Sequence, residues 1–138
     1  MPIIYQTGNL PLSCRRSGSC QPRKREMIHQ LRVYEIFEQN KRAFHERFRD
    51  HAVRIMRRHG FRILAMWEAK GPGRTEFVYI LEWSDEPTKT QAWERFMADE
   101  EWTEIKRRTA AEHGTLVGKI EDRILVLADY SPPFGVNR

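Results

Sequence analysis

The side chains best suited to acid–base chemistry are those of the five histidines and of Arg32 and Tyr34, which share one short segment. At about 100° per residue, His51 falls on the same helical face as Phe44 and Phe48. Imidazole titrates near neutral pH, so His51 could act as a general base or a ligand in a pocket between helix and sheet. The alternative is a buried histidine satisfied by one hydrogen bond, because His51 has no acidic partner four residues away.

Arg32 and Tyr34 share one face of a predicted strand. If the strand registers agree, an aromatic wall could stand beside them, made of Trp67, Phe77, Tyr79 and Trp83. A guanidinium and a phenol in such a pocket would orient a carboxylate or a hydroxyl group of a ligand. Tyr34 is then a second candidate proton acceptor. The alternative is an ion pair of Arg32 inside a packed dimer interface, with Glu35, Glu82 or Asp122 as the partner.

Patterns typical of metal or nucleotide chemistry are missing from the sequence. His45 and His59 are on the same predicted helix but roughly 21 Å apart along it, too far to share one ion. The two cysteines, Cys14 and Cys20, lie in a stretch without histidine. Glycine fingerprints, phosphate loops and serine nucleophile elbows are also absent. We therefore expect no metal and no cofactor.

The charge of the chain is concentrated at its beginning. Residues 1–26 hold five basic and one acidic residue, whereas the sequence from Met27 onward holds 19 basic and 18 acidic residues. A nearly balanced domain does not favour nucleic-acid binding. Residues 1–26 lack apolar periodicity, which predicts a disordered basic extension, with Met27 as an alternative start and 27–138 as the domain. Without a membrane-spanning apolar run or a secretory signal, a cytoplasmic protein is expected.

The elements that must position these side chains follow from periodicity and turn residues. The pattern predicts strands at 28–36, 61–68, 76–83 and 119–129, and helices at 40–59, 86–98 and 99–113. Basic residues followed by Gly60 predict the end of the first helix. The order β-α-β-β-α(α)-β predicts an α+β, ferredoxin-like fold with a four-stranded antiparallel sheet.

Such a sheet carries its helices on one face only. Here both faces of the predicted strands are rich in apolar and aromatic residues, so a bare second face would form a large apolar patch. We expect this face to pack against a second copy of the chain, which predicts a homodimer.

Several segments together resemble the NIPSNAP domain over nearly all of residues 27–132. They are Gln30–Tyr34, the helix with Phe44, Phe48 and His51 that ends at Arg58–Gly60, the strand Gly73–Tyr79, the helix Ala92–Met97, the start Asp99–Trp102 and the final segment Ile120–Pro132. The resemblance implies a dimeric α+β barrel in which two sheets face each other. It implies no settled activity, although the same superfamily contains cofactor-independent monooxygenases and isomerases.

Two functional hypotheses follow. The first is a homodimeric NIPSNAP-type protein that binds a small, largely apolar ligand or a protein partner, with candidate ligand contacts at Arg32, Tyr34, His51, Trp67, Tyr79 and Trp83. The second is a cofactor-independent monooxygenase or isomerase with His51 or Tyr34 as proton acceptor. A cavity that contains one of these two side chains would favour the second hypothesis over a filled core.

Overall fold

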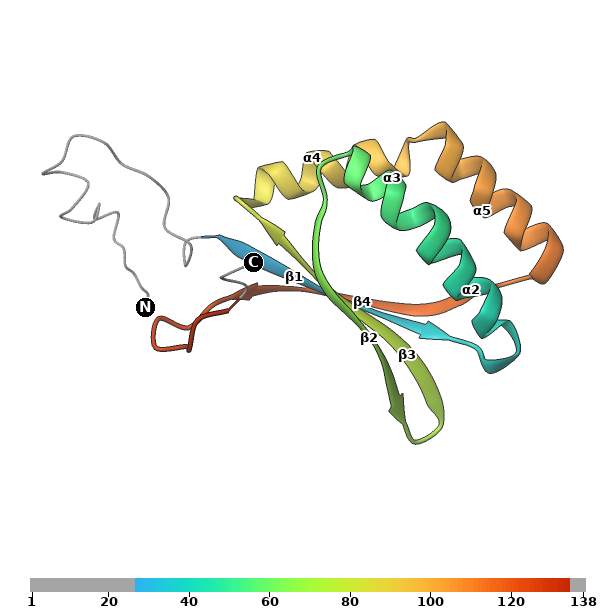
Figure 1. Cartoon of the computed structure of the whole chain (residues 1–138), viewed down its shortest axis with the longest axis horizontal. Coiled ribbons are helices and arrows are strands. Elements are labelled where there is room, and N and C mark those ends of the chain that lie inside the picture. The colour runs from blue at the N-terminus through green and yellow to red at the C-terminus, as the bar shows by residue number, and fades with distance from the viewer. Residues whose placement is uncertain (1–26, 135–138) are drawn as a thin grey trace, which may run out of the picture.

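The computed structural model describes residues 27–134. Its strands are β1 (Ile28–Ile36), β2 (Arg62–Gly71), β3 (Arg74–Trp83) and β4 (Val117–Val126), and its α-helices are α2 (Lys41–Arg47), α3 (Val53–Arg58), α4 (Glu86–Met97) and α5 (Glu100–His113). The strands form one antiparallel sheet in the order β2-β3-β1-β4 (Figure 1). The predicted α+β, ferredoxin-like order is confirmed, whereas the predicted disordered extension lies outside the described residues.

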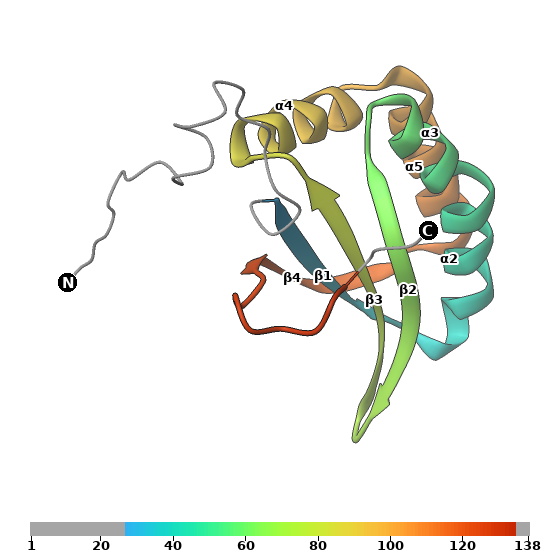
Figure 2. The same ribbon diagram turned by 60° about the vertical axis from the view of Figure 1, so that its left-hand side comes forward.

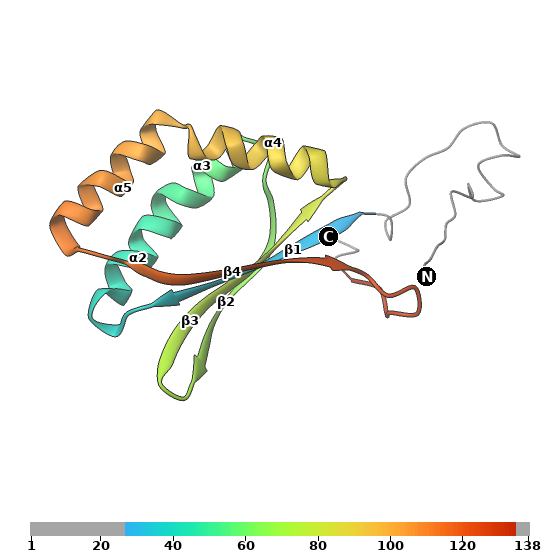
Figure 3. The same ribbon diagram turned by 180° about the vertical axis from the view of Figure 1, so that it is seen from behind.

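The helices cover one face of the sheet, as the sequence predicted. Seen from behind, α2, α3, α4 and α5 all lie above the strands, and the opposite face carries no helix (Figure 3). No helix of residues 27–134 is long and apolar enough to cross a membrane. The helix-bearing face of the sheet is therefore where a side-chain core forms.

The first helical region runs from residue 41 to 58 but is not regular throughout. A π-helical turn, Phe48–Ala52, separates α2 from α3. The helical face with Phe44 and Phe48 is buried together with Ala52 and Ile55, since Phe44, Ala52 and Ile55 are at most 1 % exposed and Phe48 is 5 % exposed. The helix ends at Arg58, and Gly60 just beyond the C-cap His59 has a φ of 91°, in the left-handed region that glycine adopts without a Cβ clash.

The predicted hairpin is β2–β3, with Gly71 paired to Arg74 across Pro72 and Gly73. In the register of β2 against β3 there is a bulge between Ile63 and Ala65. A bulge places one extra residue in a strand, so the residues beyond it point to opposite faces from those that strict alternation predicts.

The core lies between the helices and the sheet, and β1 and β3 supply its floor. On β3 the residues that face the helices alternate through Phe77, Tyr79, Leu81 and Trp83, all at most 4 % exposed. The other face of the sheet carries partly exposed apolar side chains, among them Leu31, Val33, Val78 and Ile80. After β4 the chain turns back near this open face (Figure 2), where the Phe134 ring packs edge-on against His29 at 5.3 Å.

Candidate ligand-binding site

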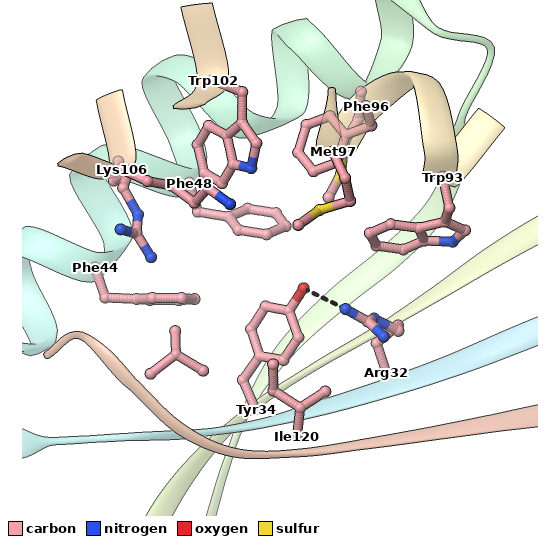
Figure 4. A pocket seen from close by; sticks show the side chains of 13 residues that line it. Arg32, Tyr34, Phe44, Phe48, Trp93, Phe96, Met97, Trp102, Lys106 and Ile120 are labelled. Carbon is pink, nitrogen blue, oxygen red and sulfur yellow. Dashed lines mark hydrogen bonds between the residues drawn. The ribbon is translucent and has the colours of Figure 1, made fainter. Parts of the chain in front are cut away.

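A cavity of about 200 Å³ lies between the helices and the sheet. It is lined by Arg32, Tyr34, Phe44, Arg47, Phe48, Met56, Trp93, Phe96, Met97, Trp102, Lys106, Val117 and Ile120. In Figure 4 the Tyr34 side chain rises from β1 into the space enclosed by the aromatic rings of the helices. Two lining residues are about half exposed, Met97 on α4 (52 %) and Ile120 on β4 (49 %), so the cavity opens between these two elements.

Tyr34 belongs to a chain of hydrogen bonds at the floor of the cavity. Its hydroxyl group lies 2.6 Å from that of Tyr79 and accepts a hydrogen bond from the Arg32 guanidinium at 3.2 Å. Arg32 also pairs with Asp122 of β4, with 2.6 Å between Nη1 and Oδ2, and its guanidinium lies 4.3 Å from the Trp93 ring centroid. These contacts orient Arg32 and Tyr34 toward the same space (Figure 4).

Gln30 holds the residues around Arg32 in place. Its side chain is 1 % exposed and makes three hydrogen bonds. The amide nitrogen donates to Asp122 Oδ2 at 2.8 Å, and the amide oxygen accepts from the indole nitrogens of Trp83 and Trp93, each at 2.9 Å. Gln30 thereby fixes both the carboxylate that pairs with Arg32 and the ring that covers it.

Burial and charge set the protonation of this network. Burial raises the pKa of the Tyr79 hydroxyl well above its ordinary value, and the adjacent Tyr34 raises it further. Burial acts to lower the pKa of Arg32, but the Tyr34 and Tyr79 oxygens outweigh it, so the net shift is upward. At neutral pH the floor of the cavity therefore carries a guanidinium cation beside a neutral Tyr79 hydroxyl.

Two further cations lie at the other end of the cavity, beside Trp102. The Arg47 guanidinium carbon is 5.4 Å from the centroid of the Trp102 ring, and Lys106 Nζ is 5.8 Å from it. Arg47 donates a hydrogen bond to the Thr109 hydroxyl at 2.9 Å, and burial lowers its pKa. Within residues 27–134, neither Arg47 nor Lys106 forms an ion pair with a carboxylate.

The structure brings together only some of the residues that the sequence suggested. Arg32 and Tyr34 line the cavity, and Tyr79 lies directly behind Tyr34. Of the three carboxylates suggested as ion-pair partners of Arg32, the structure shows Asp122 in contact with it, and not Glu35 or Glu82. Trp83 is buried, and its indole nitrogen bonds to Gln30 outside the cavity lining.

Trp67 lies away from this site. Its ring is 49 % exposed, and Trp67 pairs with Val78, which belongs to the open face of the sheet. The predicted wall assumed strict alternation along β2. The bulge after Ile63 reverses the faces, so Met66 instead of Trp67 shares a face with Tyr79.

His51 also lies outside the cavity lining, partly exposed, with Nδ1 3.2 Å from Arg54 Nη2. The predicted place of His51 in a pocket, on the same helical face as Phe44 and Phe48, is wrong. The reason is the π-helical turn that contains it, whose i→i+5 hydrogen bonds do not keep the 100° spacing of an α-helix. Across residues 27–134 no group of three or more His, Cys, Asp or Glu side chains is placed to hold a metal ion.

Sequence reasoning missed the contribution of the helices to the site. Trp93, Met97 and Trp102 stand at a helical spacing that is typical of core residues; Trp102 is indeed buried, and all three also line the cavity. Arg47 and Lys106 are basic residues at helical positions like many others in the chain. Their proximity to one tryptophan ring depends on how α2 packs against α5, which periodicity does not reveal.

A family model described as NIPSNAP matches residues 29–132. The chain belongs to the NIPSNAP family. The match specifies no ligand and no reaction. No curated protein matches the chain.

Solved structures of other NIPSNAP proteins share the fold. A NIPSNAP-like domain protein from Burkholderia xenovorans is 21 % identical, with 79 % of this chain and 91 % of that one covered and a TM-score of 0.66. A NIPSNAP family protein with unknown function from Agrobacterium tumefaciens is 20 % identical, with 80 % and 96 % covered and a TM-score of 0.67. A second protein of the family from the same organism is 17 % identical, with 77 % and 97 % covered and a TM-score of 0.66. At these identities the likeness establishes the fold.

Proposed function

We propose that this NIPSNAP protein binds a small, largely apolar molecule in the cavity between its helices and its sheet. The observation that supports this most directly is the cavity itself, which is open at one side and lined mainly by aromatic and aliphatic side chains. A few polar groups converge on it, which is typical of ligand sites. Its volume of about 200 Å³ lies below the usual range of about 300–1,000 Å³, so the ligand is small.

We further propose that the protein acts as a homodimer through the open face of the sheet. Leu31, Val33, Val78 and Ile80 form an apolar surface there that no helix covers. Contact with a second sheet would bury this surface, and two-fold dimers are the commonest way in which soluble proteins do so. The cavity lies on the opposite side of the sheet and stays accessible in such a dimer. A cytoplasmic location remains a prediction from the sequence.

Native mass spectrometry of the purified full chain tests both parts of this proposal. We expect twice the mass of the chain, together with a bound small molecule that is released on denaturation. Phe48→Trp adds volume inside the cavity. We expect this variant to retain less of the bound molecule and to remain a dimer. A monomer with an unliganded mass, both as purified and after incubation with small apolar compounds, would argue against the proposal.

A specific observation supports catalysis as a second candidate function. The Tyr34 hydroxyl lies in the cavity between the Arg32 guanidinium and the Tyr79 hydroxyl, where a cation could stabilise negative charge that develops on a substrate oxygen. A cofactor-independent monooxygenase or isomerase could use Tyr34 as its proton acceptor beside this cation. Of the two proton acceptors that the sequence suggested, Tyr34 lines the cavity and His51 does not, which favours Tyr34 for this role.

Tyr34→Phe separates catalysis from binding. In an enzyme, this variant should retain the ligand but lose about 10²–10⁴-fold in turnover, because the group that transfers the proton is gone. In a binding protein, the variant changes only the ligand affinity, and neither the wild type nor Tyr34→Phe converts the bound molecule.

A further inference from the structure

The cavity contains an excess of positive charge. Of the 13 residues that line it, Arg32, Arg47 and Lys106 are basic and none is acidic. Asp122 neutralises Arg32 from outside the lining. Arg47 and Lys106 both lie within 5.8 Å of the Trp102 ring centroid. Neither has a carboxylate partner among residues 27–134. One end of the cavity is therefore neutralised and the other is not.

Arg47 and Lys106 both lie beside the Trp102 ring, so their like charges repel each other, and partial burial weakens the screening of that repulsion by water. An anionic group of a ligand, placed between the two cations, would attract both of them and offset their repulsion. The Trp102 ring faces both cations but offers them only its π-electrons, and the Thr109 hydroxyl satisfies a single donor of Arg47. No other acceptor within residues 27–134 is hydrogen-bonded to these two side chains, so their remaining donors are available to a ligand.

We infer that the ligand of this cavity is a small apolar molecule with a single carboxylate group, and that Arg47 and Lys106 bind this carboxylate beside Trp102. The inference rests on the proposed binding function and specifies its ligand class. The apolar part of the ligand then extends along Phe48 and Phe96 toward the floor of the cavity, where the Tyr34 hydroxyl lies. A guanidinium matches the two oxygens of a carboxylate, and an ammonium adds a point charge.

Octanoate and 1-octanol form a matched pair of probes, since they share an eight-carbon chain and differ in the carboxylate. Isothermal titration of each into the full chain is expected to show at least tenfold tighter binding of octanoate. Lys106→Gln should weaken octanoate binding about tenfold and leave 1-octanol binding within twofold. Lys106→Arg keeps the charge and should preserve the preference for octanoate.

Lys119→Gln is the matched control, because it removes the same charge from an exposed residue of β4 that does not line the cavity. We expect it to leave both affinities unchanged. Equal affinities for the two probes, or an equal loss of both in Lys106→Gln, would overturn the carboxylate assignment and leave the binding function intact. Failure of both probes to bind would overturn the binding function and the assignment together.

Discussion

At the scale of single residues, the site depends on side chains that hold other side chains. Gln30 makes no contact with the cavity, yet it connects Trp83, Trp93 and Asp122 through three hydrogen bonds. The sequence placed Arg32 and Tyr34 on one face of a strand, and this alternation is why that part of the site was predictable. It gave no reason to single out Gln30, because its partners lie 53 to 92 residues away in the chain.

Gln30→Leu should destabilise the protein by about 1–3 kcal/mol, because the variant leaves buried indole N–H groups without an acceptor. Urea unfolding measures the difference. Gln91→Leu is the control, since Gln91 is exposed on α4, and we expect a change within about 0.5 kcal/mol. Equal stability of the two variants would show that the buried amide contributes nothing.

Asp99 determines where α5 begins and so where Trp102 lies. Its carboxylate accepts hydrogen bonds from the Trp102 backbone N–H at 2.9 Å, from the His59 ring at 2.8 Å and from Arg58 at 2.9 Å. The bond from His59 is the main cause that holds the pKa of Asp99 far below its ordinary value. The ionised form is therefore the one that stabilises the folded chain.

Asp99→Ala should cost about 0.5–2 kcal/mol at pH 7, as expected for the loss of a helix N-cap. A carboxylate whose pKa is lower in the folded state stabilises the protein above its unfolded pKa of about 3.9 and loses this effect as the pH falls below it. The difference between wild type and variant should thus shrink below about pH 4. Urea unfolding from pH 3 to 7, with the exposed Asp129→Ala as control, measures it; a difference independent of pH would contradict the account.

At the scale of secondary structure, the sequence predicted the four strands and the α-helical regions of residues 27–134, but not the two local irregularities that displaced predicted site residues. Gly60, Asp85 and Gly114 mark helix boundaries through side-chain size or capping oxygens, which are readable from the sequence. The π-helical turn at Phe48–Ala52 and the bulge after Ile63 have no comparable signature. They place His51 and Trp67 away from the predicted site.

His51→Asn tests the consequence of the π-helical turn. A buried histidine would cost about 1–3 kcal/mol when its partner is left unsatisfied, and a general base would be needed for turnover. His51 is partly exposed, and within residues 27–134 its side chain is hydrogen-bonded only to the exposed Arg54, so we expect a stability change within about 0.5 kcal/mol and unchanged octanoate binding. A loss of more than about 1 kcal/mol in urea unfolding would place His51 in the core after all.

At the scale of the whole molecule, the sheet separates two surfaces with different proposed roles. The helix-bearing face contains the cavity, and the open face is the proposed contact between two chains. Because these surfaces lie on opposite sides of the sheet, changes on one should leave the other intact. The sequence indicated apolar residues on both faces of the strands, but it did not show which face borders a pocket.

Ile80→Glu should convert the proposed dimer into a monomer, because it places a charge in the middle of the open face. Sedimentation velocity of the full chain measures the change, and circular dichroism confirms that the variant is folded. The control is Ala110→Glu on the exposed side of α5, which should remain dimeric. A wild-type chain that sediments as a monomer at micromolar concentration would refute the dimer.

The most direct test of the binding cavity follows the four indole N–H signals of the ¹⁵N-labelled chain in two-dimensional NMR spectra. Trp93 and Trp102 line the cavity, whereas Trp67 and Trp83 do not and serve as internal controls. During titration with octanoate or 1-octanol, we predict saturable shifts of the Trp93 and Trp102 signals, with those of Trp67 and Trp83 nearly unchanged. No saturable shift of Trp93 or Trp102 with either compound, or shifts confined to Trp67, would contradict a ligand-binding cavity between the helices and the sheet.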